Sequence, residues 1–338
     1  MRRSHFRRTL AAVTLAATAL TLAGCSGDDE EPTADSSPQA VAGGSTLDST
    51  WPLTGLEVTG DESAAQDHPV IVTKIDNTSS SAPQVGLGSA DMVVEELVEG
   101  GLTRLAVFFY SDLPDEVGPV RSMRASDIGI VSSTDATVVT SGAAPRTIKR
   151  ISGAGIDFVA EGAAGITRAT DRSAPYNVMA DLTTIADKID QQDEVRPDDY
   201  LPWGDESDFP QGQKATAITA SFGGHTTEWK YQGGSYQNTN GYAGQGDEFS
   251  ADNVLVLRVK VGDAGYLDPA GNPVPETEFE GKGEAMLFHG GQLVRGTWQK
   301  DGLDGTITLS TKAGKLTVPA GHTWIELVPQ DNGSVQFN

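Results

Sequence analysis

The chain has 338 residues, a formal net charge of −23 and one cysteine. A charge of this sign opposes general binding to nucleic acids, to phosphate-bearing polymers and to anionic lipid surfaces. The single cysteine excludes a disulfide within the chain, so the folded state must depend on its hydrophobic core.

Residues 1–25 have the pattern of a bacterial lipoprotein signal. A basic head with four arginines precedes the apolar segment Leu10–Leu22, which is too short to span a bilayer permanently. The segment closes on Leu22-Ala23-Gly24-Cys25, and we expect Cys25 to carry the lipid and become the new N-terminus. An ordinary secretory peptide with an incidental cysteine is the alternative, and twin-arginine export is a further one. The pattern predicts an extracytoplasmic protein with a lipid anchor in the cell membrane.

Residues 26–50 are rich in Asp, Glu, Ser, Pro and Gly and offer almost nothing apolar to bury, which predicts a disordered tether. Removing the four signal arginines from a chain of net charge −23 leaves a mature charge of −27. The first residues that we expect to fold are Trp51-Pro52-Leu53.

Strands and helices alternate over residues 51–196, which predicts an N-terminal α/β domain with a mixed sheet. Gly100-Gly101 separates two β-rich runs, so residues 91–98 and 102–110 read as a hairpin, although a helix over residues 90–98 is an alternative. The other expected strands cover residues 69–75, 137–140 and 156–159, and the expected helices cover 126–133, 145–151 and 181–189.

The composition changes at residues 197–213, where Pro, Asp and Gly predict a connection. Residues 214–330 then predict a C-terminal all-β domain, a mostly antiparallel sandwich or open barrel. Its seven short β-rich runs lie at residues 215–222, 226–231, 254–261, 284–288, 292–298, 306–310 and 322–328. The whole mature chain is therefore expected to belong to the α+β class.

The chemistry of the chain concentrates in residues 93–124, where Glu95, Glu96, Glu99 and three arginines flank an apolar run. Residues 68–196 hold eight Arg and three Lys, whereas residues 197–338 hold two Arg and seven Lys. Arginine is favoured where a planar fork must hold a carboxylate or a phosphate. The first half is therefore the half in which we expect specific contacts with anions.

Several separate blocks resemble the YerB-like lipoproteins, a family built from domains of unknown function. The blocks include Cys25 at the signal end, Pro52-Leu53-Thr54-Gly55, Ile75-Asp76-Asn77, Val98–Arg104, Gly118–Arg124, Asp171–Asn177, Gly296–Lys300 and Pro319–Ile325. The resemblance covers roughly residues 51–329. It implies a two-part extracytoplasmic lipoprotein with no established activity.

We expect a binding or assembly module of the cell envelope, with an arginine-lined site for a small anionic ligand or an acidic segment of a partner protein. The candidate ligand-binding residues are Arg104, Arg121, Arg124, Arg172, Asp76, Asn77, Glu95, Glu99 and Asn177. Internal ion pairs among these residues are the alternative interpretation. We expect no cofactor, no metal and no nucleic-acid partner.

A cell-envelope hydrolase is the second functional hypothesis. It would act on a phosphoester or glycan with two of Glu95, Glu96 and Glu99 as acid and base. Ser122 and Ser141 lack a neighbouring base and a nucleophile-elbow motif, so no catalytic residue is assigned. Trp298 and Trp324 could stack on a sugar, but we favour a place for them in the core.

Overall fold

A mixed sheet of 13 strands runs through the part of the chain that the computed structural model describes, which is residues 49–60, 62–189 and 195–338. Its strands are β1 (Ile71–Asp76), β2 (Met92–Leu97), β3 (Thr103–Phe109), β4 (Thr137–Thr140), β5 (Phe158–Ala160), β9 (Gln213–Lys214), β14 (Asn253–Leu267), β15 (Pro273–Glu278), β16 (Gly281–His289), β17 (Gln292–Lys300), β18 (Ile307–Thr311), β19 (Gly314–Leu316) and β21 (Thr323–Pro329). The order is β19-β18-β17-β16-β14-β21-β2-β3-β1-β4-β5, with β15 paired to β14 and β9 to β17.

A second, antiparallel sheet has the order β13-β12-β11-β10-β22. Its strands are β10 (Ala217–Ser221), β11 (Thr226–Gln232), β12 (Ser235–Asn238), β13 (Ser250–Ala251) and β22 (Ser334–Phe337). Two small pairs join β6 (Ile166–Arg168) to β7 (Val178–Ala180) and β8 (Trp203–Gly204) to β20 (Val318–Pro319). The helices are α1 (Asp127–Val131), α2 (Pro145–Gly153) and α3 (Leu182–Ala186).

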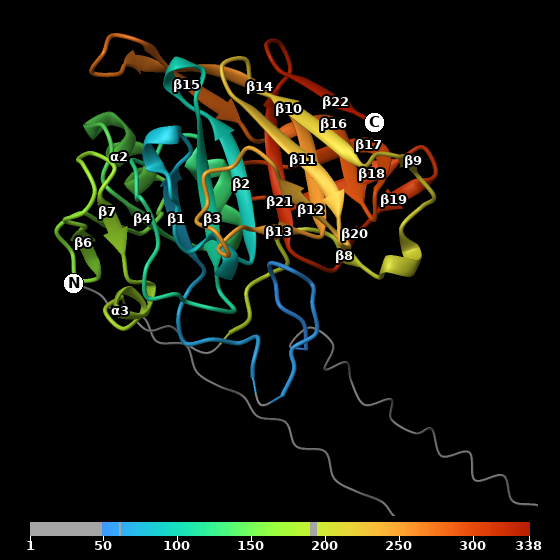
Figure 1. The fold of residues 1–338 in the computed structure, drawn as a ribbon, viewed down its shortest axis with the longest axis horizontal. Helices are drawn as coiled ribbons and strands as arrows, with labels where there is room; N and C mark the ends of the chain where they lie inside the picture. The colour runs from blue at the N-terminus through green and yellow to red at the C-terminus, as the bar shows by residue number, and fades with distance from the viewer. Residues whose placement is uncertain (1–48, 61, 190–194) are drawn as a thin grey trace, which may run out of the picture. The chain divides into compact units, whose positions relative to one another are not determined.

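Strands from the two halves of the chain continue one sheet. β21 lies between β2 and β14 and is parallel to both, as Figure 1 shows near the middle of the molecule. The expected α+β class with a mixed sheet is confirmed, and so is the hairpin of β2 and β3, whose residues pair in antiparallel register. The domain limits drawn at residues 197–213 stay a prediction.

The large sheet has an apolar layer on each face. Along β2, Val94 packs into the layer that holds Ile130 of α1 and Ile151 of α2, whereas Val93 packs into the layer that holds Ile185 of α3 and Trp229 of the second sheet. Successive side chains of a strand point to opposite faces, so a strand buried on both faces reads as a continuous apolar run. This burial explains why β2 is a strand and not the alternative helix.

A groove opens where β14 leaves β16. The two strands pair only from Asn253 to Leu257 of β14, which turns to β15 from Lys260 onward. The carbonyl of Arg258 lies between these pairings and accepts hydrogen bonds from Nε1 of Trp298 (3.1 Å) and Nε2 of Gln330 (3.1 Å). The resulting groove has a volume of about 700 Å³ and is lined mainly by polar side chains.

Gly283 is required at the bottom of this groove. A Cβ atom there would lie 2.3 Å from the Arg258 carbonyl oxygen and 2.6 Å from Nε1 of Trp298. We expect Gly283→Ala to lower the free energy of unfolding by about 1–3 kcal/mol, as overpacking typically does. Urea unfolding would measure the loss. The control is Gly153→Ala in α2, where a Cβ meets nothing within 4 Å, and equal losses in both variants would contradict the argument.

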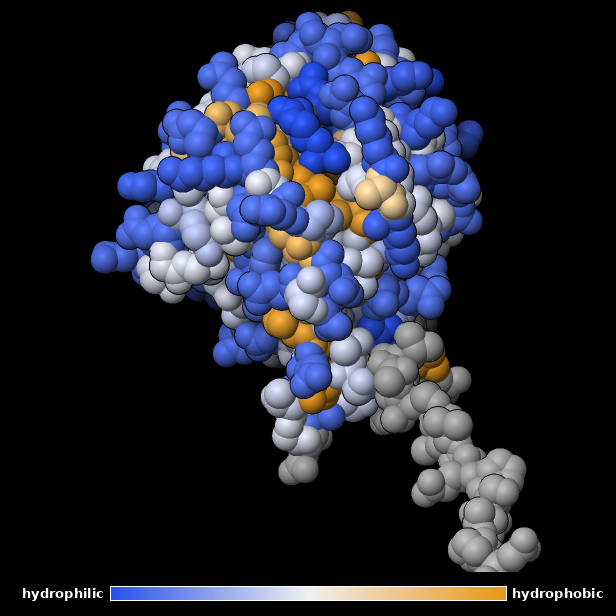
Figure 2. All heavy atoms as spheres, turned by 90° about the vertical axis from the view of Figure 1, so that its right-hand side faces the viewer, coloured by the Kyte–Doolittle hydropathy of each residue, from blue (hydrophilic) through white to orange (hydrophobic). Residues whose placement is uncertain are grey.

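The large exposed hydrophobic residues of the described chain come from separate segments of the sequence, at Leu56, Leu102, Val195, Leu267 and Leu303. Figure 2 shows the side that faces right in Figure 1 as mostly hydrophilic, with narrow hydrophobic areas between the polar ones. Within the described residues, no helix is both long enough and apolar enough to span a membrane.

The aromatic side chains considered for sugar stacking belong to the core, as favoured above. Trp298 is 1% exposed and Trp324 is 2% exposed. Trp324 packs edge-on against Trp229 with ring centroids 5.0 Å apart, which ties β21 to the second sheet.

Candidate functional site

Several loops meet at one edge of the large sheet. β1 and β4 are parallel, so Asp76 at the end of β1 and Ser141 after β4 lie at the same edge. Arg104 near the start of β3 is directly opposite Asp76, because β3 is antiparallel to β1. The loop of residues 121–124 is held there too, since the Arg121 N–H donates to the Lys74 carbonyl and the Ser141 N–H to the Arg121 carbonyl. Ligands of α/β sheets commonly bind at this kind of edge.

Arg124 is held by Glu99 in a bidentate ion pair. Nε of Arg124 lies 2.6 Å from Oε1 of Glu99, and Nη2 lies 2.7 Å from Oε2. Burial opposes ionisation of Glu99, but the hydrogen bonds and the charge of Arg124 outweigh it and lower the pKa of this carboxyl group. The two side chains therefore use much of their hydrogen-bonding capacity in bonds to each other.

Arg121 is partly engaged. Its Nε lies 3.1 Å from Oδ2 of Asp76, and its Nη1 donates to the Pro175 carbonyl at 3.3 Å. The guanidinium also stacks over the ring of Tyr176, 5.2 Å from the centroid. Its side chain keeps 22% of its surface exposed, so it is the most open guanidinium of the three at this edge.

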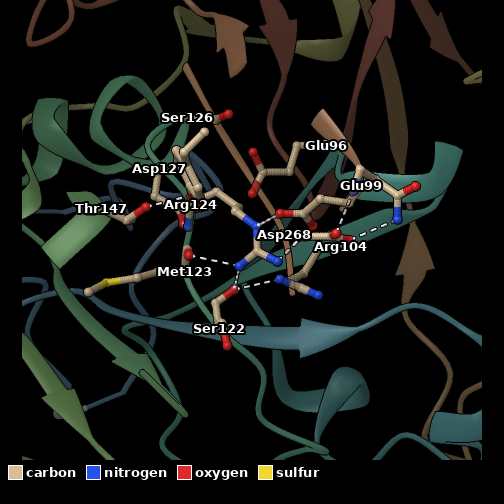
Figure 3. A network of polar contacts seen from close by, with 12 residues as sticks. Glu96, Glu99, Arg104, Ser122, Met123, Arg124, Ser126, Asp127, Thr147 and Asp268 are labelled. Carbon is tan, nitrogen blue, oxygen red and sulfur yellow. Dashed lines mark hydrogen bonds and ion pairs between the residues drawn. The ribbon is translucent and has the colours of Figure 1, made fainter. Parts of the chain in front are cut away.

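Arg104 is the guanidinium without a counterion. It is 6% exposed, and its Nη1 donates to the Ser122 carbonyl at 2.7 Å, the same oxygen that Nη1 of Arg124 reaches at 3.2 Å (Figure 3). No carboxylate among the described residues forms an ion pair with Arg104, and its buried Nε has no hydrogen-bond partner there. Burial, followed by the neighbouring charges of Arg124 and Arg121, lowers the pKa of Arg104 to about 10.

The structure thus brings together five of the nine candidate residues, at what we call the arginine cluster: Asp76, Glu99, Arg104, Arg121 and Arg124. Asn77 and Glu95 lie on the other face of the sheet, where Nδ2 of Asn77 donates to Oε1 of Glu95 at 3.1 Å. The remaining two bind other loops: Arg172 donates to the Ser81 and Pro83 carbonyls, and Asn177 bonds to Arg168 and the Ala169 carbonyl.

A buried ion triad lies behind the cluster, and the sequence analysis missed two of its members. Nζ of Lys74 is 2.7 Å from Glu96 and 2.6 Å from Asp127, and all three side chains are 0% exposed. Burial raises the pKa of Glu96 to about 7, against the opposing charge of Lys74. A lysine inside the apolar run Ile71–Ile75 was the available signal, because a buried lysine needs a carboxylate partner.

A second buried carboxyl pair joins the halves of the chain. Glu95 of β2 is in register with Glu326 of β21, and both are fully buried. Glu95 accepts from Oγ1 of Thr227 at 2.9 Å, and Glu326 accepts from Nε1 of Trp229 at 2.8 Å. Burial, followed by the charge of Glu95, raises the pKa of Glu326 well above its ordinary value. Nothing in the local sequence pattern indicated this pairing.

The three glutamates proposed for hydrolysis do not converge. Glu95 and Glu96 are neighbours on β2 and point to opposite faces of the sheet, and Glu99 is held by Arg124. Among the described residues, no group of three or more acidic, histidine or cysteine side chains is placed to hold a metal ion. The hydrolase hypothesis stays a prediction to which this geometry adds no support.

Comparison with known proteins identifies a family from the sequence, and a relative that is similar in both sequence and structure. Residues 53–195 match the model described as "Protein of unknown function (DUF3048) N-terminal domain", and residues 216–325 match the C-terminal domain of the same name. The chain is 28% identical over 294 residues to the Bacillus subtilis (strain 168) protein named "Putative lipoprotein YerB", covering 82% of this chain and 86% of that protein. The crystal structure of YerB from Bacillus subtilis has the same fold, with a TM-score of 0.70 at 22% identity over 85% of this chain and 99% of the other.

Proposed function

Because the chain belongs to the two-domain DUF3048 family, a family of unknown function, we propose a function from the arginine cluster. We propose a lipid-anchored, extracytoplasmic binding or assembly module of the cell envelope. Its cluster accepts a small anionic group, carried either by a free ligand or by an acidic segment of a partner protein.

The anchoring part of the proposal rests on the sequence and on one relative. The signal pattern ends at Cys25, which lies outside the described residues, and the Bacillus subtilis relative is named a lipoprotein. A lipid on Cys25 would hold the folded body on the outer side of the membrane.

The anion-binding part of the proposal rests on the environment of Arg104. The cluster combines three guanidiniums with two carboxylates, those of Asp76 and Glu99. Arg104 is the guanidinium that forms no direct ion pair with the described residues, and it interacts with the neighbouring carboxyl groups only at longer range. A buried charge without a counterion is costly, and a bound anion would remove that cost. Arg121, the more open neighbour, and the hydroxyls of Ser122 and Ser141, 3.4 Å apart, offer further hydrogen bonds at the same edge.

A thermal-unfolding titration tests this proposal. Phosphate and citrate are added at constant ionic strength with chloride as the reference, and a ligand at 100 times its Kd stabilises the folded state by about 2.7 kcal/mol. We expect a saturable rise in Tm for the unmodified protein and no rise for Arg104→Gln, because the unpaired charge is gone. The matched control is Arg150→Gln, since Arg150 pairs with Glu276 outside the cluster.

The ligand-dependent rise is compared within each variant, so a changed baseline stability of Arg104→Gln does not obscure the result. An equal rise in the unmodified protein and in Arg104→Gln would place anion binding elsewhere. No rise with either anion, together with no heat of binding in calorimetry for acidic peptides, would overturn the proposal.

A further inference from the structure

A small cavity lies between the two halves of the chain, apart from the arginine cluster. Its volume is about 140 Å³, and its lining comes from the β1–β2 connection and from the C-terminal half. The lining side chains that matter here are Asn77, Gln84, Asn238, Glu248, Phe249 and Trp324. Sites for small molecules occur preferentially at such junctions and combine apolar walls with a few fixed polar groups.

The loop between β12 and β13 borders this cavity and is held to the β1–β2 connection by hydrogen bonds. The Asp247 carboxylate accepts hydrogen bonds from the N–H groups of Gly86 (2.6 Å) and Gly88 (2.9 Å). Gln84 pairs with the loop through its backbone, donating to the Tyr242 carbonyl at 2.7 Å and accepting from the Gly244 N–H at 2.9 Å. The cavity is therefore formed before any ligand arrives, which reduces the entropy lost on binding.

The side-chain amide donors of Asn77 and Gln84 are already used. Nδ2 of Asn77 donates to Glu95 and Thr103, and Nε2 of Gln84 donates to the Asp76 carbonyl at 2.7 Å. The Asp76 carbonyl can only accept a hydrogen bond, so the side-chain atom of Gln84 that faces it must be the donor Nε2. The polar atom that Gln84 offers to the cavity is therefore Oε1. Among the described residues, Nδ2 of Asn238 is the side-chain amide nitrogen of the lining without a hydrogen bond.

Two donors of the lining residues have no hydrogen bond within the described part of the chain, Nδ2 of Asn238 and the buried Nε1 of Trp324. The unused acceptors are on Gln84 and on Glu248, which is an acidic residue. Gln84 is 1% exposed and receives no hydrogen bond at Oε1 from the described residues. Glu248 uses Oε2 for the Gly246 N–H and keeps its negative charge and its other oxygen. Phe249 and Trp324, with ring centroids 5.8 Å apart, add aromatic surface to the wall. Carboxylate and amide oxygens beside aromatic rings favour a cation that carries N–H donors.

We propose that this cavity binds a small organic ammonium ion, with the ammonium group at Gln84 and Glu248 and the alkyl part against Phe249 and Trp324. The net charge of −23 raises the local concentration of such a cation around the protein. Anions of the same size are disfavoured, because the acceptors and the carboxylate repel them.

Binding of three molecules that share a four-carbon chain tests the proposal: n-butylammonium, butan-1-ol and butyrate. Calorimetry on the full folded chain is expected to show saturable binding of n-butylammonium only. Glu248→Gln should weaken its binding about tenfold or more, because a hydrogen bond to a charged group is lost. Glu280→Gln is the matched control, since Glu280 is exposed and lies outside the lining.

A second variant fills the cavity without touching charge. Ala243 lines the same space, and Ala243→Leu is expected to abolish n-butylammonium binding while phosphate still raises Tm through the arginine cluster. Binding that is unchanged in Ala243→Leu, or equal binding of n-butylammonium and butan-1-ol, would overturn the proposal. Absence of n-butylammonium binding to the unmodified protein would overturn it as well.

Discussion

Lys74→Met is expected to lower the free energy of unfolding by about 3–5 kcal/mol, the usual cost of breaking a buried ion pair by removing one partner. The substitution leaves Glu96 and Asp127 facing each other at 0% exposure, and no water reaches them. For a chain of this size we expect the midpoint of thermal unfolding to fall by about 10 °C. Differential scanning calorimetry at pH 7 would measure the shift.

Two comparisons separate the loss of the ion triad from the loss of a lysine in general. Lys230→Met removes a lysine from the exposed side of β11 and should change the stability by less than about 0.5 kcal/mol. Adding Glu96→Gln to Lys74→Met should restore part of the stability, because it removes a stranded carboxylate. A double variant less stable than Lys74→Met alone would show that the triad is not the cause.

The protein is expected to be more stable at pH 5.5 than at pH 8.5, and Glu326→Gln should reduce that difference. The folded-state pKa of Glu326 is raised well above 4.5, so unfolding above that pH releases a proton and stability falls as the pH rises toward the folded-state value. Glu96, with a pKa of about 7, acts in the same direction and over the same interval. Urea unfolding at the two pH values measures how the free energy of unfolding changes with pH.

Lys300 opposes this trend near the upper end of the interval, because burial lowers its pKa to about 8, whereas His322 acts in the same direction as Glu326. The pKa of His322 is raised, chiefly by its hydrogen bond to Asp252, so its contribution is complete below 6.5 and is lost as the pH rises through its folded-state value. The pKa of Glu99 is lowered, so its contribution is lost only in more acidic solution. Each unit of elevated pKa corresponds to about 1.4 kcal/mol.

Glu326→Gln keeps the shape of the side chain and its hydrogen bond from Trp229 but removes the titration. We expect its stability relative to the unmodified protein to be at least about 1 kcal/mol greater at pH 8.5 than at pH 5.5. Glu284→Gln on the exposed part of β16 is the control. The same pH slope in Glu326→Gln and in the unmodified protein would rule out Glu326 as the titrating group.

Local patterns were sufficient for the hairpin of β2 and β3 and for helix α2, because apolar alternation, Gly100-Gly101 and Pro145 act over a few residues. The same patterns could not reveal that β21 pairs with β2, since that contact joins distant parts of the chain. Strands β12, β15 and β22 were missed as well, because their polar, Pro-containing or terminal segments show little alternation.

For the arginine cluster, the sequence analysis named residues of one short segment but treated neighbours as if they shared a face. Asp76 and Asn77 are adjacent, so Asp76 meets Arg121 while Asn77 meets Glu95 on the other side of the sheet. Strict alternation along a strand would have predicted this separation. The lack of a direct ion pair for Arg104 could not be predicted, because it depends on tertiary contacts. Glu96 pairs with Lys74 and Glu99 pairs with Arg124, so neither carboxylate pairs with Arg104.

The parallel contact of β2 with β21 also constrains how the chain must fold during biosynthesis. One edge of β2 pairs with β3 in its own hairpin, but the other edge pairs with β21, which is synthesised much later than β2. An unpaired strand edge is a template for aggregation, and long-range pairing is slow. A chain exported before folding would avoid this exposure in the cytoplasm, since β2 and β21 would then meet only after all of it has been made.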